Sequence, residues 1–129
     1  MNETGVVADA SAVIALLVGE RFAGFEPLRL AAACISAVNL SEVWSRLQEI
    51  GMPESAVEAA VAELDLVVVP FDEPQARAAA RLRALRRHAG LSLGDRACLA
   101  LGMTLGRPVV TADRAWAGLD LGVEVVTIR

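Results

Sequence analysis

The sequence predicts an α/β fold with a mainly parallel sheet, and three observations support this prediction. Short apolar runs rich in Val and Ile alternate along the chain with longer segments whose apolar residues recur at helical spacing. Strands that alternate with helices pair in parallel through right-handed crossovers. The chain has 129 residues, 55% of them apolar, and shows no internal repeat or linker. We therefore expect one domain over residues 1–129 with a substantial buried core.

The first strand and the first helix meet at a carboxylate. Val6–Ala8 is a short buried strand, and the apolar residues from Ala12 to Leu17 then recur at helical spacing, so the chain turns near Asp9. Ligands of open α/β sheets bind outside the carboxyl ends of the strands, which makes Asp9 a candidate site residue. Asp is also a favoured helix N-cap. For Asp9 alone, both interpretations stay open.

The next segment contains a second strand and a second acid. Residues 20–32 mix Gly and Pro with helix formers and indicate a loop with a broken helix. A brief strand over residues 33–36 follows, and we expect Asn39 to cap a helix that runs to about Ile50. Glu42 stands three residues after Asn39, in a variant of the capping box.

The middle of the chain contributes two helices and a third strand. Gly51 ends one helix and Pro53 begins the next. Residues 66–69 are continuously apolar, which predicts a strand covered on both faces. A long helix follows, from Asp72 to about Gly90. Its arginines largely avoid the apolar stripe: Arg77, Arg81, Arg83, Arg86 and Arg87. They form either a solvated face of the helix or a patch that contacts phosphates.

The last third repeats the pattern of acids at junctions. Ser92 precedes Asp95 by three residues, which is typical of a helix start. A fourth strand covers residues 109–111, Asp113 follows its carboxyl end, and the last strand lies within residues 123–128.

The composition excludes several kinds of chemistry. All twelve basic residues are Arg, so a Walker phosphate loop and Schiff-base catalysis both lack their Lys. Phosphoaspartate phosphatases and phospho-receiver domains also rely on a Lys, and those phosphatases carry a second Asp where this chain has Ser11. His88 is the single His, which argues against Ser–His and multi-His zinc sites. Carboxylates remain to carry any chemistry.

The cysteines and the lengths of the apolar runs indicate the cellular compartment. Cys34 and Cys98 lie in apolar surroundings and are expected to be buried free thiols of a reducing, cytoplasmic compartment. No apolar run approaches the length of a membrane span, and no basic segment precedes the first apolar run. We expect no membrane association and no signal peptide.

Four carboxylates are expected to converge at one edge of the sheet. Asp9 and Asp113 follow strands, while Glu42 and Asp95 open helices that start on the same side. A capping role can explain each of these acids by itself. It does not explain why an acid occurs at all four junctions between strands and helices. Two carboxylates about 4 Å apart repel by roughly 4 kcal/mol at an effective dielectric of about 20, so protons or cations must relieve the repulsion. Oxygen ligands without His or Cys favour Mg²⁺ or Mn²⁺.

These residues resemble a known family. The segments Asp9-Ala-Ser, Asn39-Leu-Ser-Glu, Leu91-Ser-Leu-Gly-Asp and Thr111-Ala-Asp resemble the four acidic motifs of PIN-domain ribonucleases, and most closely those of the VapC-type toxins of bacterial toxin–antitoxin systems. The resemblance implies a three-layer α/β/α domain whose five-stranded sheet has the order 3-2-1-4-5. It also implies Mg²⁺-dependent endoribonuclease activity on RNA, homodimerisation, and inhibition by a cognate antitoxin.

The resemblance also implies roles for individual residues. Asp9 and Asp95 would be the principal metal ligands. Glu42 would bind metal directly or through water, and Asp113 would complete the catalytic site. Ser11 and Thr111, each two residues from an acid, would orient ligands or water from behind them.

Two matters stay open at the level of the sequence. The candidates for holding the RNA backbone are Arg83, Arg86, Arg87 and Arg96. The alternative to a nuclease is a catalytically silent PIN-like binding module.

Overall fold

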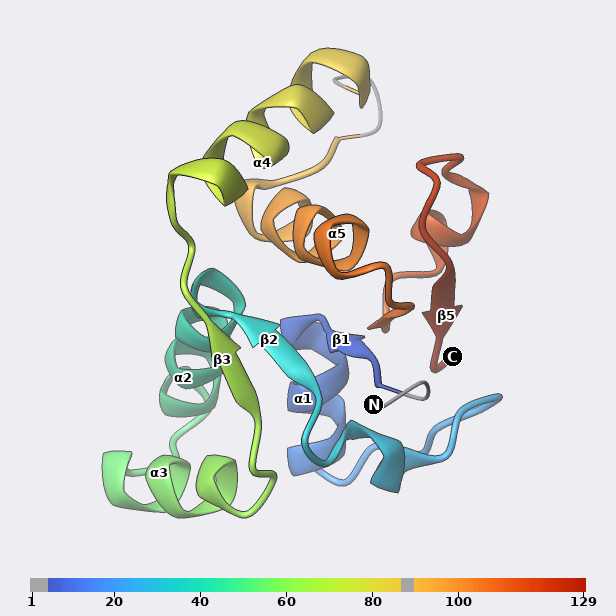
Figure 1. Ribbon diagram of the computed structural model, residues 1–129. Helices are drawn as coiled ribbons and strands as arrows, with labels where there is room; N and C mark the ends of the chain where they lie inside the picture. The colour runs from blue at the N-terminus through green and yellow to red at the C-terminus, as the bar shows by residue number, and fades with distance from the viewer. Residues whose placement is uncertain (1–4, 87–89) are drawn as a thin grey trace.

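The computed structural model describes residues 5–86 and 90–129 and shows five parallel strands at its centre (Figure 1). The strands stand side by side in the order β3-β2-β1-β4-β5, and every pair is parallel. The expected fold class and strand order are thereby confirmed. The strands are β1 (Val7–Ala8), β2 (Cys34–Ser36), β3 (Val67–Val69), β4 (Val109–Thr111) and β5 (Val125–Thr127).

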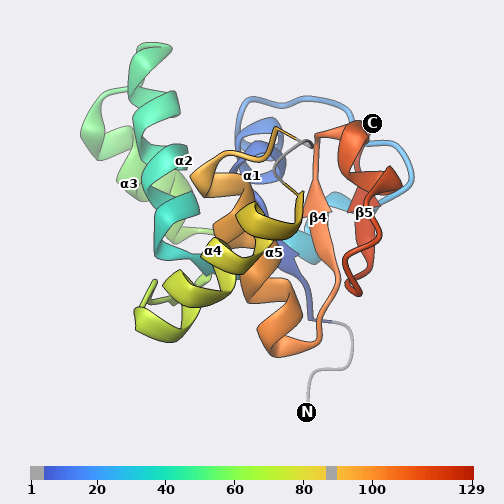
Figure 2. The ribbon, with the colours of Figure 1, turned by 90° about the horizontal axis from the view of Figure 1, so that it is seen from above.

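Helices cover both faces of this sheet. Figures 1 and 2 show α1, α2 and α3 on one side and α4 and α5 on the other. No helix in the described ranges is long and apolar enough to cross a membrane. The α-helices are α1 (Ala10–Leu17), α2 (Ala37–Glu49), α3 (Glu54–Ala62), α4 (Glu73–Arg86) and α5 (Leu93–Leu105), and the 3₁₀ helices are η1 (Pro27–Leu30) and η3 (Arg114–Gly118).

The alternation of side chains along the strands divides the core into two parts. Val6 and Ala8 pack toward α1 and α2, whereas Val7 between them packs toward α5. In the same way Val110 faces the first layer and Val109 the second. Successive strand residues point to opposite faces, so short strands are enough to anchor both helical layers.

Strand β3 differs from the expectation. It pairs only with β2, at the edge of the sheet, and Val67 and Val68 are 51% and 45% exposed. The prediction that residues 66–69 are covered on both faces was therefore wrong. An apolar run indicates a strand, but its place in the sheet depends on the other strands, and the last strand of an open sheet has one unpaired edge.

The start of α2 also differs from the expectation. Ser36 caps this helix by accepting a hydrogen bond from Val38 N at 3.2 Å, so the helix begins at Ala37, two residues before the predicted cap. Asn39 therefore lies inside the helix, where it is fully buried, and Glu42 stands beyond the first turn. Ser is as good an N-cap as Asn, and the end of β2 decided between them.

Candidate active site

The register between β1 and β4 brings Asp9 beside Thr111. Val7 pairs with Val109 and Ala8 with Val110, so the residues that follow lie next to each other at the carboxyl ends of the two strands. Asp9 keeps the orientation of Val7, two residues earlier, and so faces α5. The Thr111 hydroxyl donates to Asp9 Oδ2 at 2.9 Å.

Ser11 holds the same oxygen from the other side. Its hydroxyl donates to Asp9 Oδ2 at 2.5 Å and accepts from Ala112 N at 2.9 Å. Thr111 Oγ1 accepts in the same way from Asp113 N, at 3.1 Å. The two hydroxyls also lie 3.2 Å from each other, so the side chains of Ser11, Thr111 and Asp9 form one connected network. Both hydroxyls donate to Oδ2, which fixes the orientation of the Asp9 carboxylate.

The role of Asp9 as a helix cap is now decided. Asp9 occupies the N-cap position of α1, but its side chain makes no capping hydrogen bond. Asp9 as a whole is 6% exposed, and its carboxylate is turned toward Ser11 and Thr111 instead. Capping of α1 therefore does not account for the orientation of the Asp9 side chain.

Asp95 caps α5 and also interacts electrostatically with Asp9. It completes a capping box at the start of α5, where Asp95 N donates to Ser92 Oγ at 3.1 Å and Ser92 N donates to Asp95 Oδ2 at 2.9 Å. The same residue raises the pKa of Asp9 by charge repulsion. The cap thus fixes a carboxylate within electrostatic reach of Asp9.

Glu42 is positioned by a buried amide and by a glycine. Asn39 Nδ2 donates both to Glu42 Oε1 and to the carbonyl of Gly94, each at 3.0 Å. A Cβ at position 94 would collide with both carboxylate oxygens of Glu42 and lie 2.6 Å from its Cδ. Gly94 therefore allows the Glu42 carboxylate to lie against the first turn of α5, one residue from Asp95.

Electrostatics shows that these acids meet in one place. Burial raises the pKa of Asp9, against the opposing effect of the Ser11 and Thr111 hydrogen bonds, and repulsion from Asp95 adds to it. Partial burial of the carboxylate raises the pKa of Glu42, although the residue as a whole is exposed, and Asp9 and Asp95 raise it further. We call Asp9, Glu42 and Asp95 the acidic cluster.

Cys98 lies beneath the acidic cluster on α5. Complete burial raises the pKa of its thiol well above the ordinary value, and all three acids raise it further. Cys98 and Cys34 are both buried and free, as expected from the sequence.

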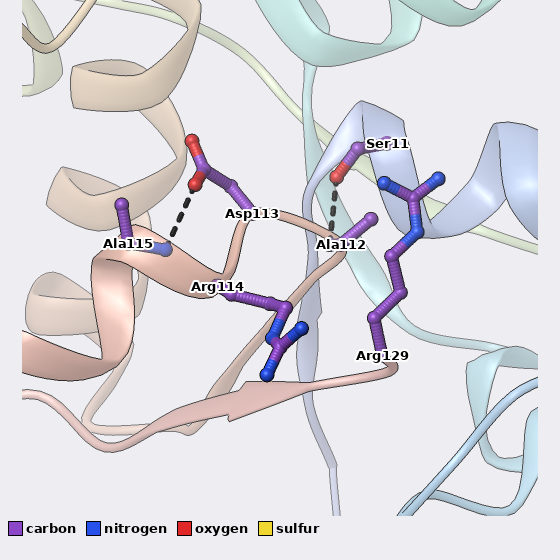
Figure 3. Close-up of a pocket in the computed structure, with 6 residues that line it drawn as sticks. All are labelled: Ser11, Ala112, Asp113, Arg114, Ala115 and Arg129. Atoms are coloured by element: carbon purple, nitrogen blue, oxygen red, sulfur yellow. Dashed lines mark hydrogen bonds between the residues drawn. The ribbon is translucent and has the colours of Figure 1, made fainter.

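Asp113 stands apart from the acidic cluster. Its carboxylate is exposed and accepts a hydrogen bond from Ala115 N at 3.0 Å, which caps η3. Figure 3 shows this bond on one side of the loop that follows β4. Unlike Asp95, Asp113 is not among the causes of the raised pKa of Asp9.

The proposed RNA-contacting arginines have different positions. Arg96 points inward, because its Nη1 donates to the carbonyl of Ala79 at 3.2 Å and ties α5 to α4. Arg83 is exposed on α4. The side chain of Arg86 and the whole of Arg87 lie outside the described residues.

Two arginines that the sequence analysis did not single out lie beside Ser11. Arg114 and Arg129 line a pocket whose wall includes Ser11, the residue bonded to Asp9 (Figure 3). The sequence could have indicated both residues, because each follows shortly after the carboxyl end of a strand, Arg114 after β4 and Arg129 after β5.

Comparison with known proteins identifies the family. The PIN domain family model matches residues 6–121. The chain belongs to the PIN domain family. None of the curated protein sequences compared with it matches significantly.

Solved structures with the same fold include several toxin–antitoxin proteins. VapBC2 from Rickettsia felis, bound to a DNA fragment from its promoter, has a TM-score of 0.76 at 12% identity, over 96% of this chain and 98% of that one. VapC20 of Mycobacterium tuberculosis, described as a toxin that cleaves the sarcin–ricin loop, has a TM-score of 0.70 at 19% identity, over 93% of this chain and 99% of that one. At these identities the likeness establishes the fold.

The residues of this PIN domain fit a hard divalent cation held partly through water. In the described ranges, no three acidic, His or Cys side chains are grouped so as to enclose a metal ion directly. Mg²⁺ uses one or two carboxylates and keeps several waters, so it does not require such a cage. A buried carboxylate that two acids repel and that two hydroxyls contact is the kind of site that this cation relieves. The Oδ1 atom of buried Asn39 also has no hydrogen-bond partner among the described residues.

Proposed function

We propose that this PIN domain is a Mg²⁺- or Mn²⁺-dependent endoribonuclease that serves as the toxin of a toxin–antitoxin pair. The observation that carries the proposal is the buried Asp9 carboxylate, which two hydroxyls orient and which Asp95 and Glu42 repel. A purely structural role would not gather three acids of which two, Asp9 and Glu42, have a raised pKa. The family and the toxin–antitoxin structures that share its fold support the same function.

Each residue has a distinct task in this proposal. Asp9 and Asp95 would hold the cation, with Glu42 as a direct or water-mediated ligand and Asp113 at the margin of the site. Such a cation activates water as a nucleophile and stabilises negative charge on the leaving oxygen. Ser11 and Thr111 donate to Asp9 and favour its charged form, which is the form that binds a cation.

Cleavage of RNA tests the proposal directly. The purified protein, free of any partner, is incubated with a structured RNA in the presence of Mg²⁺, Mn²⁺ or a chelator. We expect cleavage with either metal, none with the chelator, and products that end in a 3′-hydroxyl and a 5′-phosphate. Asp9→Asn should reduce the rate by orders of magnitude. A wild-type protein that binds RNA but never cleaves it would favour the silent binding module.

The partners in this proposal are a cognate antitoxin and a second copy of the chain. A hollow of about 450 Å³ lies along α1, and its lining combines the apolar residues Ile14, Ala15, Val18 and Ile50 with Ser11, Glu20, Arg46 and Arg129. Val18 and Ile50 are 49% and 51% exposed, which suits coverage by a protein segment. An antitoxin could insert an Arg among the carboxylates and replace the charge of a cation. Sedimentation that shows a monomer at all concentrations up to tens of micromolar would contradict the homodimer.

A further inference from the structure

A pocket of about 410 Å³ opens next to the acidic cluster. Ser11 forms part of its wall and is bonded to Asp9 Oδ2, so the pocket and the cluster share a boundary. In Figure 3 the Arg129 side chain runs from the end of β5 to the level of Ser11, while Arg114 extends from the loop after Ala112. The lining consists of Ser11, Ala112, Asp113, Arg114, Ala115 and Arg129.

Arg114 is held in place through its backbone. Asp113 caps the 3₁₀ helix that begins at Arg114, and Trp116 anchors this helix in the core at 2% exposure. The Arg114 side chain is exposed and forms no ion pair with any residue that the structure describes. Its charge is therefore available to a ligand in the pocket.

Arg129 is held in place at both its backbone and its side chain. The preceding residue, Ile128, is fully buried and donates its N–H to the Thr111 carbonyl at 3.1 Å. The guanidinium binds Glu20 through two bonds, from Nε to Oε2 at 3.0 Å and from Nη2 to Oε1 at 2.8 Å. This pair fixes the plane of the guanidinium and leaves its Nη1 donors outside the pair.

We propose that Arg114 and Arg129 form a subsite that binds a phosphate of the RNA backbone next to the phosphodiester acted on at the acidic cluster. The planar donor fork of Arg matches phosphate oxygens, and two such groups share this pocket. Asp113 also lines the pocket, but Figure 3 shows its carboxylate turned away from both arginines and bonded to Ala115 N. The subsite rests on the proposed function for its substrate class, because RNA is the polyanion that the nuclease would hold.

The need for this subsite follows from charge. The acidic cluster repels a polyanion, so a backbone that reaches it must be held by cationic groups close by. Arg96 does not supply them, since it donates inward to Ala79. Arg114 and Arg129 lie on the wall that contains Ser11 and supply positive charge beside the acidic cluster.

RNA binding measured in chelator tests the subsite apart from cleavage. The probe is a fluorescein-labelled hexauridylate, and its anisotropy is followed between about 50 and 200 mM salt. Arg114→Gln and Arg129→Gln should each weaken binding several-fold and reduce the slope of log affinity against log salt by about 0.7, the value for one phosphate contact on a single strand. Arg114→Lys keeps the charge and should restore the slope. In cleavage assays the same Gln variants should raise KM and leave kcat nearly unchanged.

Arg29 supplies the matched control. It is an exposed arginine in η1, which leads into the amino end of β2, whereas Arg114 and Arg129 follow the carboxyl ends of parallel strands. Arg29→Gln removes the same charge and should leave the salt slope as in the wild type. Circular dichroism confirms that each variant is folded.

The outcomes separate the subsite from the nuclease. If the wild type cleaves RNA and both Gln variants keep its RNA affinity, salt dependence and KM, the proposed subsite is contradicted and the proposed nuclease activity is supported. If the variants lose binding while the wild type never cleaves, the subsite stands and the nuclease is wrong. A wild type that does not bind the probe, or an equal loss in Arg29→Gln, overturns the subsite.

Discussion

Thr111 on β4 donates its hydroxyl to Asp9 on β1 at 2.9 Å, across 102 positions of the sequence. The two residues meet because the parallel register places the ends of their strands side by side. Ser11 completes the arrangement from the start of α1. The orientation of the central carboxylate thus depends on a long-range sheet contact as well as on the local turn.

Thr111→Val tests this orientation. The substitution removes a bond that lowers the pKa of Asp9, so that pKa should rise further and the acid limb of the pH–rate profile for RNA cleavage should move to higher pH. It also deprives the Asp113 N–H of its acceptor, and the stability should fall by about 1–3 kcal/mol. Thr111→Ser keeps the hydroxyl and should behave as the wild type. An unmoved acid limb in the Val variant would mean that Thr111 does not tune Asp9.

The raised pKa of Asp9 predicts how stability depends on pH without metal. A carboxyl whose pKa is higher in the folded than in the unfolded state binds more protons when folded. Its contribution to stability is therefore fully present below the ordinary pKa of 3.8 and is lost as pH rises through the raised folded value. The contribution of Glu42 to stability should be lost in the same way, as pH rises above the ordinary glutamate pKa of 4.5 through the raised folded value.

Asp9→Asn isolates this contribution. In chelator, the variant should gain melting temperature relative to the wild type as pH rises across that window. Urea or thermal melts of both proteins at a series of pH values measure the difference. A constant difference between the two proteins would show that Asp9 does not titrate with folding.

Asp95→Asn separates the capping role from the cluster role. Asn can still accept the hydrogen bond from Ser92 N, and the lost charge at the start of the helix costs about 1 kcal/mol at most. Without metal the variant should therefore be within about 1 kcal/mol of the wild type, and relief of repulsion should favour the variant. With Mg²⁺ at about 100 times its dissociation constant, the wild type should gain about 2.7 kcal/mol and the variant much less. RNA cleavage by the variant should fall by orders of magnitude.

Ser92→Ala is the complementary control for Asp95. It removes the other half of the capping box and should cost about 1 kcal/mol, while keeping the negative charge. Its stabilisation by Mg²⁺ should equal that of the wild type. Metal-indifferent melts of the wild type, together with a destabilised Asp95→Asn, would leave Asp95 as a helix cap alone.

Gly94→Ala should separate activity from stability. The added Cβ collides with the Glu42 carboxylate, which is the flexible end of an exposed side chain and can swing away. Ala is favoured over Gly in a helix by about 1 kcal/mol, so the fold should lose little or no stability. Cleavage should nevertheless fall about as far as in Glu42→Gln, and the double variant Gly94→Ala/Glu42→Gln should be no worse than Glu42→Gln alone. Wild-type activity in Gly94→Ala would show that Glu42 need not lie against α5.

The sequence by itself determined the order of strands and helices and the acids at their junctions. The start of α5, with Ser92 and Asp95, was predicted correctly because a capping box is made by residues three positions apart. The position of Asp9 followed from a strand that ends where a helix begins. Each of these features depends on neighbouring residues, whose preferences are local.

The tertiary structure decided which residues these acids meet. Asn39 was predicted as a cap but is buried inside α2, where it bridges Glu42 and the carbonyl of Gly94, 55 positions away. Arg96 turned inward to α4, and β3 became the edge of the sheet. These outcomes depend on packing between elements distant in the sequence, and local propensity carries no information about such contacts because they form only when the sheet and both helical layers are assembled.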